Sequence, residues 1–233
     1  MIFDTERELQ HQLTHLDLEF EGSFATTFVR REVPIGNCIP DLIYVRFEED
    51  PNPALWPRRW TFRHAHILWL LREKHKLTLE SIASLTYESQ AKVMPVLDDL
   101  VKSGAITRSR NGLLKLSIEM ASLTAEVIAV EAKLELWKQA LAQAVEYRRF
   151  ANRVFVAMDS EKAPREPKIL DQFKETEIGL CAVKKRSLEW IVYPPNHKYT
   201  IGPDREYLIT SAARPASQQL WYRRNKRKAF LQA

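Results

Sequence analysis

The sequence predicts an α/β protein in which a central mixed sheet, flanked by helices, is interrupted by a smaller α+β module. Residues 125–159 run as a strand, a helix and a second apolar strand, and two further strand-like segments lie between residues 23 and 49. Residues 61–118, between these regions, change to three helical segments followed by a hairpin. This order of strands and helices indicates α/β regions on either side of a smaller helical module.

The N-terminal part predicts one helix and two strands. Residues 5–18 favour an amphipathic helix, because leucines recur there at helical spacing. Residues 23–36 and 39–49 alternate or run apolar and are rich in β-branched side chains, which is typical of strands. Residues 49–59 contain three prolines and predict a linker or a domain boundary.

The middle module predicts three helices and a hairpin. Thr78 suits the N-cap of the second helix, and Gly104 suits the C-terminal end of the third. Asn111 and Gly112 predict the turn of the hairpin. Three helices followed by a two-stranded wing resemble a winged helix-turn-helix. We therefore expect this module over residues 57–120, inserted between two parts of the core at residues 1–56 and 121–233.

A winged helix implies a nucleic-acid-binding surface. Contacts are expected near the N-terminal end of the third helix and in the wing, from Ser89, Gln90, Lys92, Arg108 and Arg110. The third helix also carries Glu88, Asp98 and Asp99 and contains Pro95. These residues favour the alternative that the module binds protein or mediates dimerisation.

The C-terminal part predicts two more strands after a polar loop at residues 161–167. The strands cover residues 178–183 and 188–195 and are separated by the basic turn at residues 184–187. A further basic run follows two aromatic residues near the C-terminus and contains Arg223, Arg224, Lys226, Arg227 and Lys228. Such a run attracts phosphate, and its aromatic neighbours could stack on bases. The alternative is a solvated tail.

A pair of charged residues ends the apolar strand that begins at residue 125. Glu131 and Lys133 are two positions apart, so they point to the same face of the strand. An isolated pair of this kind would be an ordinary strand-end ion pair. Here Asp41 follows a proline and opens an earlier strand, and Gln143 and Tyr147 lie four apart on the following helix.

An acidic helix, then Pro-Asp, then Glu-x-Lys, then Gln-x-x-x-Tyr resembles the order of motifs in the PD-(D/E)XK nuclease superfamily, whose fold is restriction-endonuclease-like. The resemblance implies that Asp41 and Glu131 bind Mg²⁺ or Mn²⁺, with the backbone carbonyl of Ala132 as a further ligand. Lys133 would orient or deprotonate the attacking water and offset developing charge.

The resemblance also implies a glutamate from the first helix. Glu6 fits best, because it lies three and seven positions before two inward leucines, and Glu8 is the rival. Both would otherwise be ordinary acids at a helix N-terminus. Gln143 and Tyr147 would contact the substrate strand or brace the site.

Asp41 and Glu131 are 90 positions apart in the sequence, so the resemblance requires the middle module to be inserted between neighbouring strands. The alternative partition is an N-terminal β unit and an unrelated C-terminal α/β unit, in which the two carboxylates do not meet.

Composition narrows the remaining function classes. The 233 residues include 45% hydrophobic and 28% charged residues, an ordinary globular mixture. No apolar run approaches the roughly 20 residues of a membrane-spanning helix, and two cysteines make no disulfide framework, so we expect a cytoplasmic protein without a membrane partner. The six glycines form no phosphate-binding loop, and no zinc spacing accompanies the histidines.

The sequence therefore leads to two hypotheses. The first is a metal-dependent DNA endonuclease, acting in genome defence, transposition or repair, with a homodimer or the proteins of a larger DNA-processing complex as partners. The second is a non-catalytic DNA-binding regulator or assembly subunit that uses a nuclease-like scaffold. The net charge of +5 agrees with DNA as the partner in either case.

Overall fold

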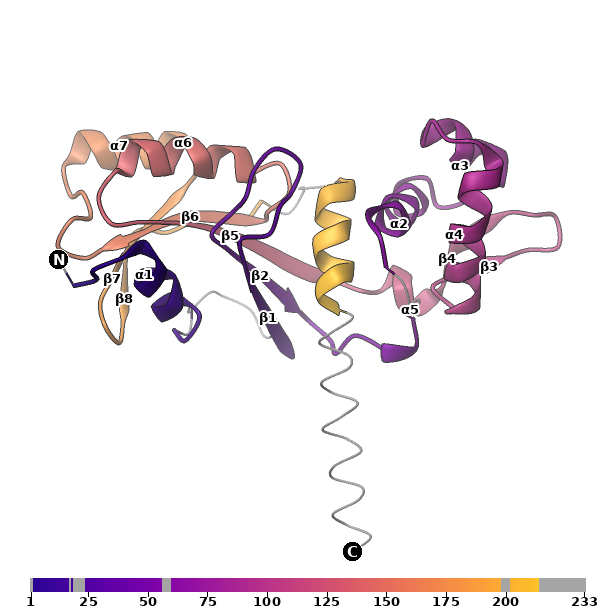
Figure 1. The fold of residues 1–233 in the computed structure, drawn as a ribbon, viewed down its shortest axis with the longest axis horizontal. Helices are drawn as coiled ribbons and strands as arrows, with labels where there is room; N and C mark the ends of the chain where they lie inside the picture. The colour runs from indigo at the N-terminus through magenta and orange to yellow at the C-terminus, as the bar shows by residue number, and fades with distance from the viewer. Residues whose placement is uncertain (1, 17, 19–23, 56–59, 198–201, 214–233) are drawn as a thin grey trace, which may run out of the picture. The chain divides into compact units, whose positions relative to one another are not determined.

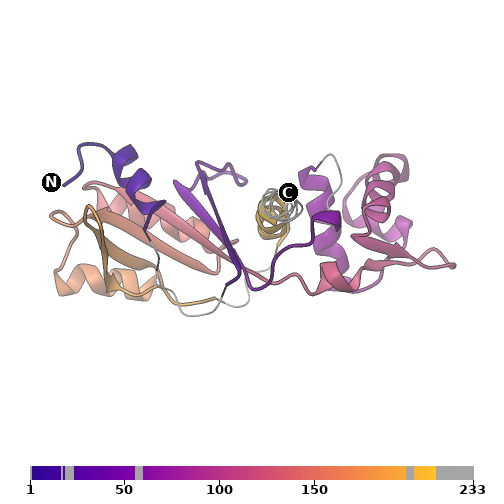
Figure 2. The same cartoon turned by 90° about the horizontal axis from the view of Figure 1, so that it is seen from below.

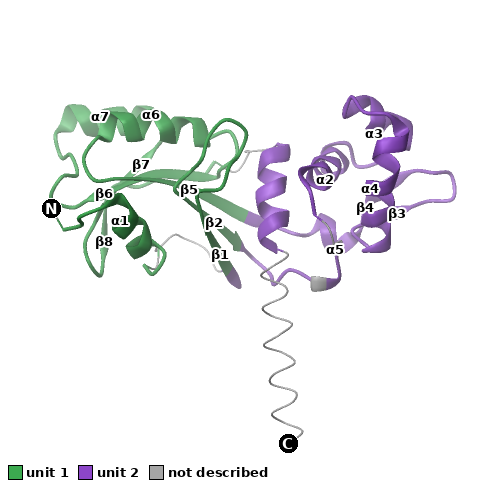
Figure 3. Ribbon diagram, viewed as in Figure 1, with its two compact units in different colours: residues 1–23, 27–46, 126–201 green, residues 24–26, 47–125, 202–233 purple. Residues whose placement is uncertain are grey.

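The chain folds into two compact units. The computed structural model describes residues 2–16, 18, 24–55, 60–197 and 202–213. Figure 3 shows the two units, which alternate along the chain. Unit 1 comprises residues 1–23, 27–46 and 126–201, and unit 2 comprises residues 24–26, 47–125 and 202–233.

A mixed six-stranded sheet forms the centre of unit 1 (Figure 1). Its order is β1-β2-β5-β6-β7-β8, with β5, β6 and β7 parallel and β8 antiparallel to β7. The strands are β1 (Thr26–Arg31), β2 (Leu42–Phe47), β5 (Ala125–Lys133), β6 (Arg153–Asp159), β7 (Gly179–Val183) and β8 (Leu188–Val192). The predicted α/β class with a central mixed sheet is confirmed.

Helices cover both faces of this sheet. Helix α1 (Glu6–Leu13) lies on one face, and α6 (Trp137–Tyr147) and α7 (Pro167–Glu175) lie on the other (Figures 1 and 2). Leu9 and Leu13 of α1 are fully buried in one apolar cluster with side chains of β2, β5, β6 and β7. The helical spacing of leucines in the sequence therefore marks the face that packs on the sheet.

Strand β5 is buried from Glu126 to Ala132, and only its two end residues are partly exposed, as its apolar sequence predicts for an interior strand. Its parallel register with β6 pairs Lys133 with Met158, and the register of β6 with β7 pairs Asp159 with Val183. The C-terminal ends of β5, β6 and β7 therefore lie along one edge of the sheet. The beginning of β7 is tightly packed, because a Cβ atom on Gly179 would lie 2.7 Å from the Cβ of Pro194.

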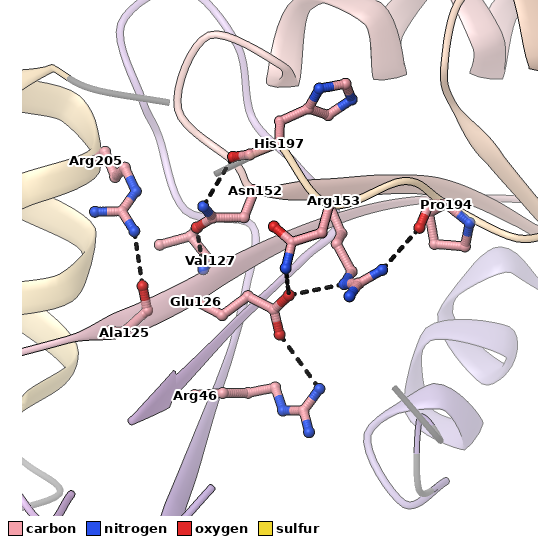
Figure 4. Close-up of polar contacts among 10 residues, drawn as sticks. Arg46, Ala125, Glu126, Val127, Asn152, Arg153, Pro194, His197 and Arg205 are labelled. Carbon is pink, nitrogen blue, oxygen red and sulfur yellow. Dashed lines mark hydrogen bonds and ion pairs between the residues drawn. The ribbon is translucent and has the colours of Figure 1, made fainter. Parts of the chain in front are cut away.

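A buried ionic network holds the opposite end of β5 (Figure 4). The Glu126 carboxylate lies 2.7 Å from Nε of Arg153 and 3.3 Å from Nη1 of Arg46. It also accepts a hydrogen bond from Asn196, and Arg153 donates to the carbonyl of Pro194. This network ties three neighbouring strands to the segment that follows β8.

Unit 2 contains the three predicted helices and the hairpin. They are α2 (Phe62–Lys74), α3 (Leu79–Leu85) and α4 (Gln90–Lys102), followed by β3 (Ile106–Arg108) and the antiparallel β4 (Leu114–Leu116). Thr78 caps α3 by accepting a hydrogen bond from the backbone of Ser81, and Gly104 has a φ of 77° after α4. Both capping predictions are confirmed. A single apolar cluster joins the helices and the hairpin.

Several elements were not predicted from the sequence. These are the 3₁₀ helix Pro53–Leu55, α5 (Ile118–Ala121), α7, and a helix over residues 203–213 that belongs to unit 2. In the last helix, Glu206 forms an ion pair with Arg72 of α2, and Tyr207 packs on Phe62. The hairpin turn is also wider than an Asn-Gly turn alone, because β3 ends at Arg108 and β4 begins at Leu114.

Among the described residues, no helix is long and apolar enough to cross a membrane.

Candidate active site

Four side chains gather at the C-terminal end of β5 in unit 1. Strand β5 supplies Glu131 and Lys133, the residue before β2 is Asp41, and α1 supplies Glu6. Asp41 lies close to the β5 residues of this group because β2 and β5 are neighbours in the sheet. Adjacent strands thus bring together two carboxylates that are 90 positions apart in the sequence.

The Asp41 carboxylate is held through both oxygens. Nε2 of Gln10, in α1, donates to Oδ1 at 2.8 Å, and the backbone N–H of Ala132 donates to Oδ2 at 2.7 Å. Burial raises the pKa of Asp41 above its ordinary value of 3.8, although the Ala132 N–H and Lys133 act in the opposite direction. The geometry therefore fixes this carboxylate, and burial makes its negative charge costly.

The Glu131 carboxylate is more deeply buried, with 2% of the side chain exposed. The Tyr147 hydroxyl donates to its Oε2 at 2.6 Å, and Nζ of Lys133 lies 3.3 Å from its Oε1. Burial raises the pKa of Glu131, and the charge of Asp41 raises it further. The pKa of Tyr147 is also raised, by burial and by Glu131, so its hydroxyl stays protonated and donates.

Lys133 forms ion pairs with two carboxylates of the group, Glu6 and Glu131. Its ammonium lies 3.2 Å from Oε2 of Glu6 and 3.3 Å from Oε1 of Glu131. Burial alone would lower the pKa of Lys133, but Glu131, Glu6 and Asp41 together raise it above 10.5. Lys133 is therefore a cation at neutral pH in this arrangement.

The donor set suits a hard divalent cation. Mg²⁺ prefers oxygen ligands and is commonly bound by one or two carboxylates together with water and substrate phosphate. Asp41 and Glu131 are two such carboxylates, and burial raises the pKa of both. Among the described residues, no set of three or more His, Cys, Asp or Glu side chains is grouped to hold a metal ion. The two carboxylates therefore match the oxygen ligands that Mg²⁺ prefers, and the Ala132 carbonyl stays the further ligand that the resemblance implies.

The other predicted site residues lie outside this group. Glu8 accepts a hydrogen bond from the backbone of Asp4, whereas Glu6 reaches Lys133. Gln143 is exposed on α6, although Tyr147 of the same helix is buried in the site.

In unit 2, the predicted nucleic-acid contacts are exposed. Ser89, Gln90 and Lys92 lie at the N-terminal end of α4, and Arg110 lies in the hairpin turn. Arg108 forms an ion pair with Asp98 of α4 at 3.1 Å. The basic run Arg223, Arg224, Lys226, Arg227 and Lys228 lies outside the described residues.

Gln10 is the residue of this site that the sequence did not predict. It is only 7% exposed, and its amide reaches Asp41. One signal was available, because Gln10 follows Glu6 by four positions on the helix and therefore shares its face.

Comparison of the chain with protein-family models, with curated proteins and with solved structures finds no match.

Proposed function

We propose that the protein is a Mg²⁺- or Mn²⁺-dependent DNA endonuclease with a restriction-endonuclease-like core of the PD-(D/E)XK type. One observation carries the proposal. Asp41, which is 90 positions from Glu131 in the sequence, lies with Glu131 and Lys133 at one buried strand end. Tyr147 and Gln10 donate hydrogen bonds to the two carboxylates. An ordinary strand-end ion pair would not require a second carboxylate, Asp41, held in place by a buried glutamine.

Each residue has a role that its contacts support. Asp41 and Glu131 would hold the cation, which supplies polarisation of the phosphoryl oxygen and a lower pKa for the attacking water. Gln10 and Tyr147 orient these two carboxylates through one hydrogen bond each. Lys133 would orient or deprotonate the attacking water and offset the charge that develops on the scissile phosphate.

Unit 2 would position the DNA as a winged helix. Support comes from its element order and from the exposed polar residues at the N-terminal end of α4. The ion pair between Arg108 and Asp98 reduces the charge that the hairpin offers to phosphate. Arg110 and Lys92 are the basic side chains of this surface that we expect to carry phosphate contacts.

A specific observation also favours the second candidate function, a non-catalytic DNA-binding regulator or assembly subunit. Lys133 already forms ion pairs with Glu6 and Glu131, and both oxygens of Asp41 accept hydrogen bonds. In a non-catalytic scaffold, these ion pairs and hydrogen bonds would be sufficient to satisfy the charged groups without a metal ion. The two candidates differ in whether a divalent cation displaces part of it.

The test is cleavage of supercoiled and linear plasmid DNA with Mg²⁺ or Mn²⁺. We expect metal-dependent nicking by the wild type and a loss of at least about 100-fold in Glu131→Gln and Lys133→Met, since such groups typically contribute 10²–10³-fold. Matched controls are Glu135→Gln and Lys162→Met, which alter an exposed pair next to the same strand end. The controls should retain wild-type activity.

The alternative outcome is equally specific. Salt-sensitive DNA binding without cleavage, unchanged in Glu131→Gln and Lys133→Met, would support the regulator or subunit instead. Equal activity in the site variants and the controls would place any observed cleavage elsewhere in the protein or in a contaminant.

A further inference from the structure

A basic turn lies on the same sheet edge as the candidate active site. Strand β7 ends at Val183 and β8 begins at Leu188, so the chain reverses over residues 184–187. A hydrogen bond of 2.8 Å from the Lys184 N–H to the Ser187 carbonyl closes the turn. Because β5, β6 and β7 are parallel and end in register, this turn lies two strands from Lys133. Two strand spacings correspond to about 10 Å.

The three cations of this turn differ from Lys133, Lys162 and Arg165 of the same edge in their ion pairing. Lys133, Lys162 and Arg165 each form an ion pair with a carboxylate. Lys184, Lys185 and Arg186 are exposed, and no ion pair or side-chain hydrogen bond holds them within the part of the chain that the structure describes. The nearby Glu189 is already paired with Arg165, although Lys184 also acts on it electrostatically.

The charge of the active site makes such a turn useful. Without a bound divalent cation, Glu6, Asp41 and Glu131 oppose the single cation of Lys133, so the ionised group carries an excess of negative charge. Duplex DNA carries about one negative charge per 1.7 Å of its axis and would be repelled. Charges act over a Debye length of roughly 8–10 Å at physiological salt, so compensation must come from cations close to the site.

We propose that the turn formed by Lys184, Lys185, Arg186 and Ser187 binds the DNA backbone phosphates that flank the phosphate at Asp41 and Glu131. The proposal rests on the proposed function, because it takes duplex DNA as the ligand. Exposed lysine and arginine side chains on a tight turn bind phosphates without reading sequence. Unit 1 thereby gains its own contact with the substrate, independent of unit 2.

The experiment measures binding of wild type and variants to a duplex oligonucleotide in EDTA, so that no cleavage occurs. The test variant combines Lys184→Gln, Lys185→Gln and Arg186→Gln. Its control combines Lys74→Gln, Lys76→Gln and Lys102→Gln, which remove the same charge from exposed positions of unit 2. Circular dichroism and thermal unfolding establish that both variants are folded.

The expected result is a change in salt dependence. Each lost phosphate contact lowers the slope of log K against log[salt] by about 0.9, so the test variant should lose about 2–3 from the slope. The control should keep the wild-type slope. An equal slope in the test variant and the control overturns the proposal while leaving the nuclease intact if the wild type still cleaves.

The remaining outcomes separate the two proposals. DNA binding with the predicted slope change but without any cleavage by the wild type supports the phosphate-binding turn and contradicts the nuclease. A wild type that neither binds nor cleaves DNA overturns both.

Discussion

At the scale of single residues, the candidate site contains buried carboxylates whose ionisation is unfavourable. Glu131 and Asp41 are carboxylates whose pKa values burial raises, so their ionised forms are less stable in the folded chain than in water. Strain of this kind is concentrated at functional sites, because a structural ion pair gains nothing from a second buried carboxylate. Replacing Glu131 should therefore relieve part of this electrostatic cost.

This cost predicts a pH-dependent effect of Glu131→Gln on stability. A carboxyl group whose pKa is raised in the folded state contributes stability at low pH, and that stability is lost as pH rises through the folded pKa. Glutamine does not titrate. The free energy of unfolding of the variant, relative to wild type, should therefore increase as pH rises above about 4.3, the ordinary glutamate pKa. Urea unfolding at pH 4 and pH 7 measures the difference.

Asp159 is a useful comparison, because its pKa is shifted in the opposite direction to that of Glu131. Burial opposes ionisation there, but the backbone N–H groups of Glu161, Phe3 and Ile2 hold the pKa of Asp159 below its usual value. Stability from such a group is present above the unfolded pKa and is lost as pH falls through the folded pKa. Asp159→Asn should destabilise more at pH 7 than at pH 3. The same pH trend in both variants would contradict the assignment for Glu131.

At the scale of elements, a different group of polar contacts lies at each end of β5. The active-site group lies at its C-terminal end, and the network of Glu126, Arg153 and Arg46 lies at its beginning. The Glu126 carboxylate is shared by two guanidinium groups and an amide. We assign it a purely structural role.

Glu126→Gln should therefore be strongly destabilising. Removal of the single acid leaves Arg153 buried without its anion, and breaking a buried pair in this way costs about 3–5 kcal/mol. Glu189→Gln breaks the exposed pair with Arg165 and should leave the urea midpoint almost unchanged. Equal midpoints for the two variants would show that the buried network contributes nothing.

The sequence predicted those elements whose local pattern matches their burial. The apolar run before Glu131 predicted an interior strand, and the leucines of α1 predicted the face that packs on the sheet. Helix α7 was missed although Ile169, Leu170 and Phe173 lie at helical spacing, because the segment has only nine residues and only Phe173 is fully buried. Helix α5 has four residues, too few for a helical period to be visible.

The site was predictable in part for a similar reason. The residue types of Asp41, Glu131 and Lys133 carry chemistry that can be read from local motifs. Gln10 carries none, and its burial against Asp41 depends on where α1 packs. The pairing of β2 with β5, which places Asp41 beside Ala132, is a contact across 91 positions that no local pattern specifies.

At the scale of the whole molecule, the chain separates two sets of elements. Residues of the candidate active site all belong to unit 1, whereas the three-helix and hairpin module and the helix over residues 203–213 belong to unit 2. The chain passes through each unit more than once, so neither unit is a simple N-terminal or C-terminal half. A ligand that binds one unit should therefore slow hydrogen exchange in several separate segments of the sequence, all of which belong to that unit.

Hydrogen exchange with added Mg²⁺ or Mn²⁺ tests this separation. Ligand binding to the folded state slows local opening, by RT ln(1 + [L]/Kd) in free energy. We expect slower exchange in peptides that contain Asp41 and residues 131–133, where the Ala132 N–H is bonded to Asp41. Peptides of α2, α3 and α4 should be unaffected. Asp41→Asn should abolish the protection, whereas Glu135→Gln should retain it. Protection that persists in Asp41→Asn, or that appears in unit 2, would place the cation elsewhere and remove the basis for assigning catalysis to the end of β5.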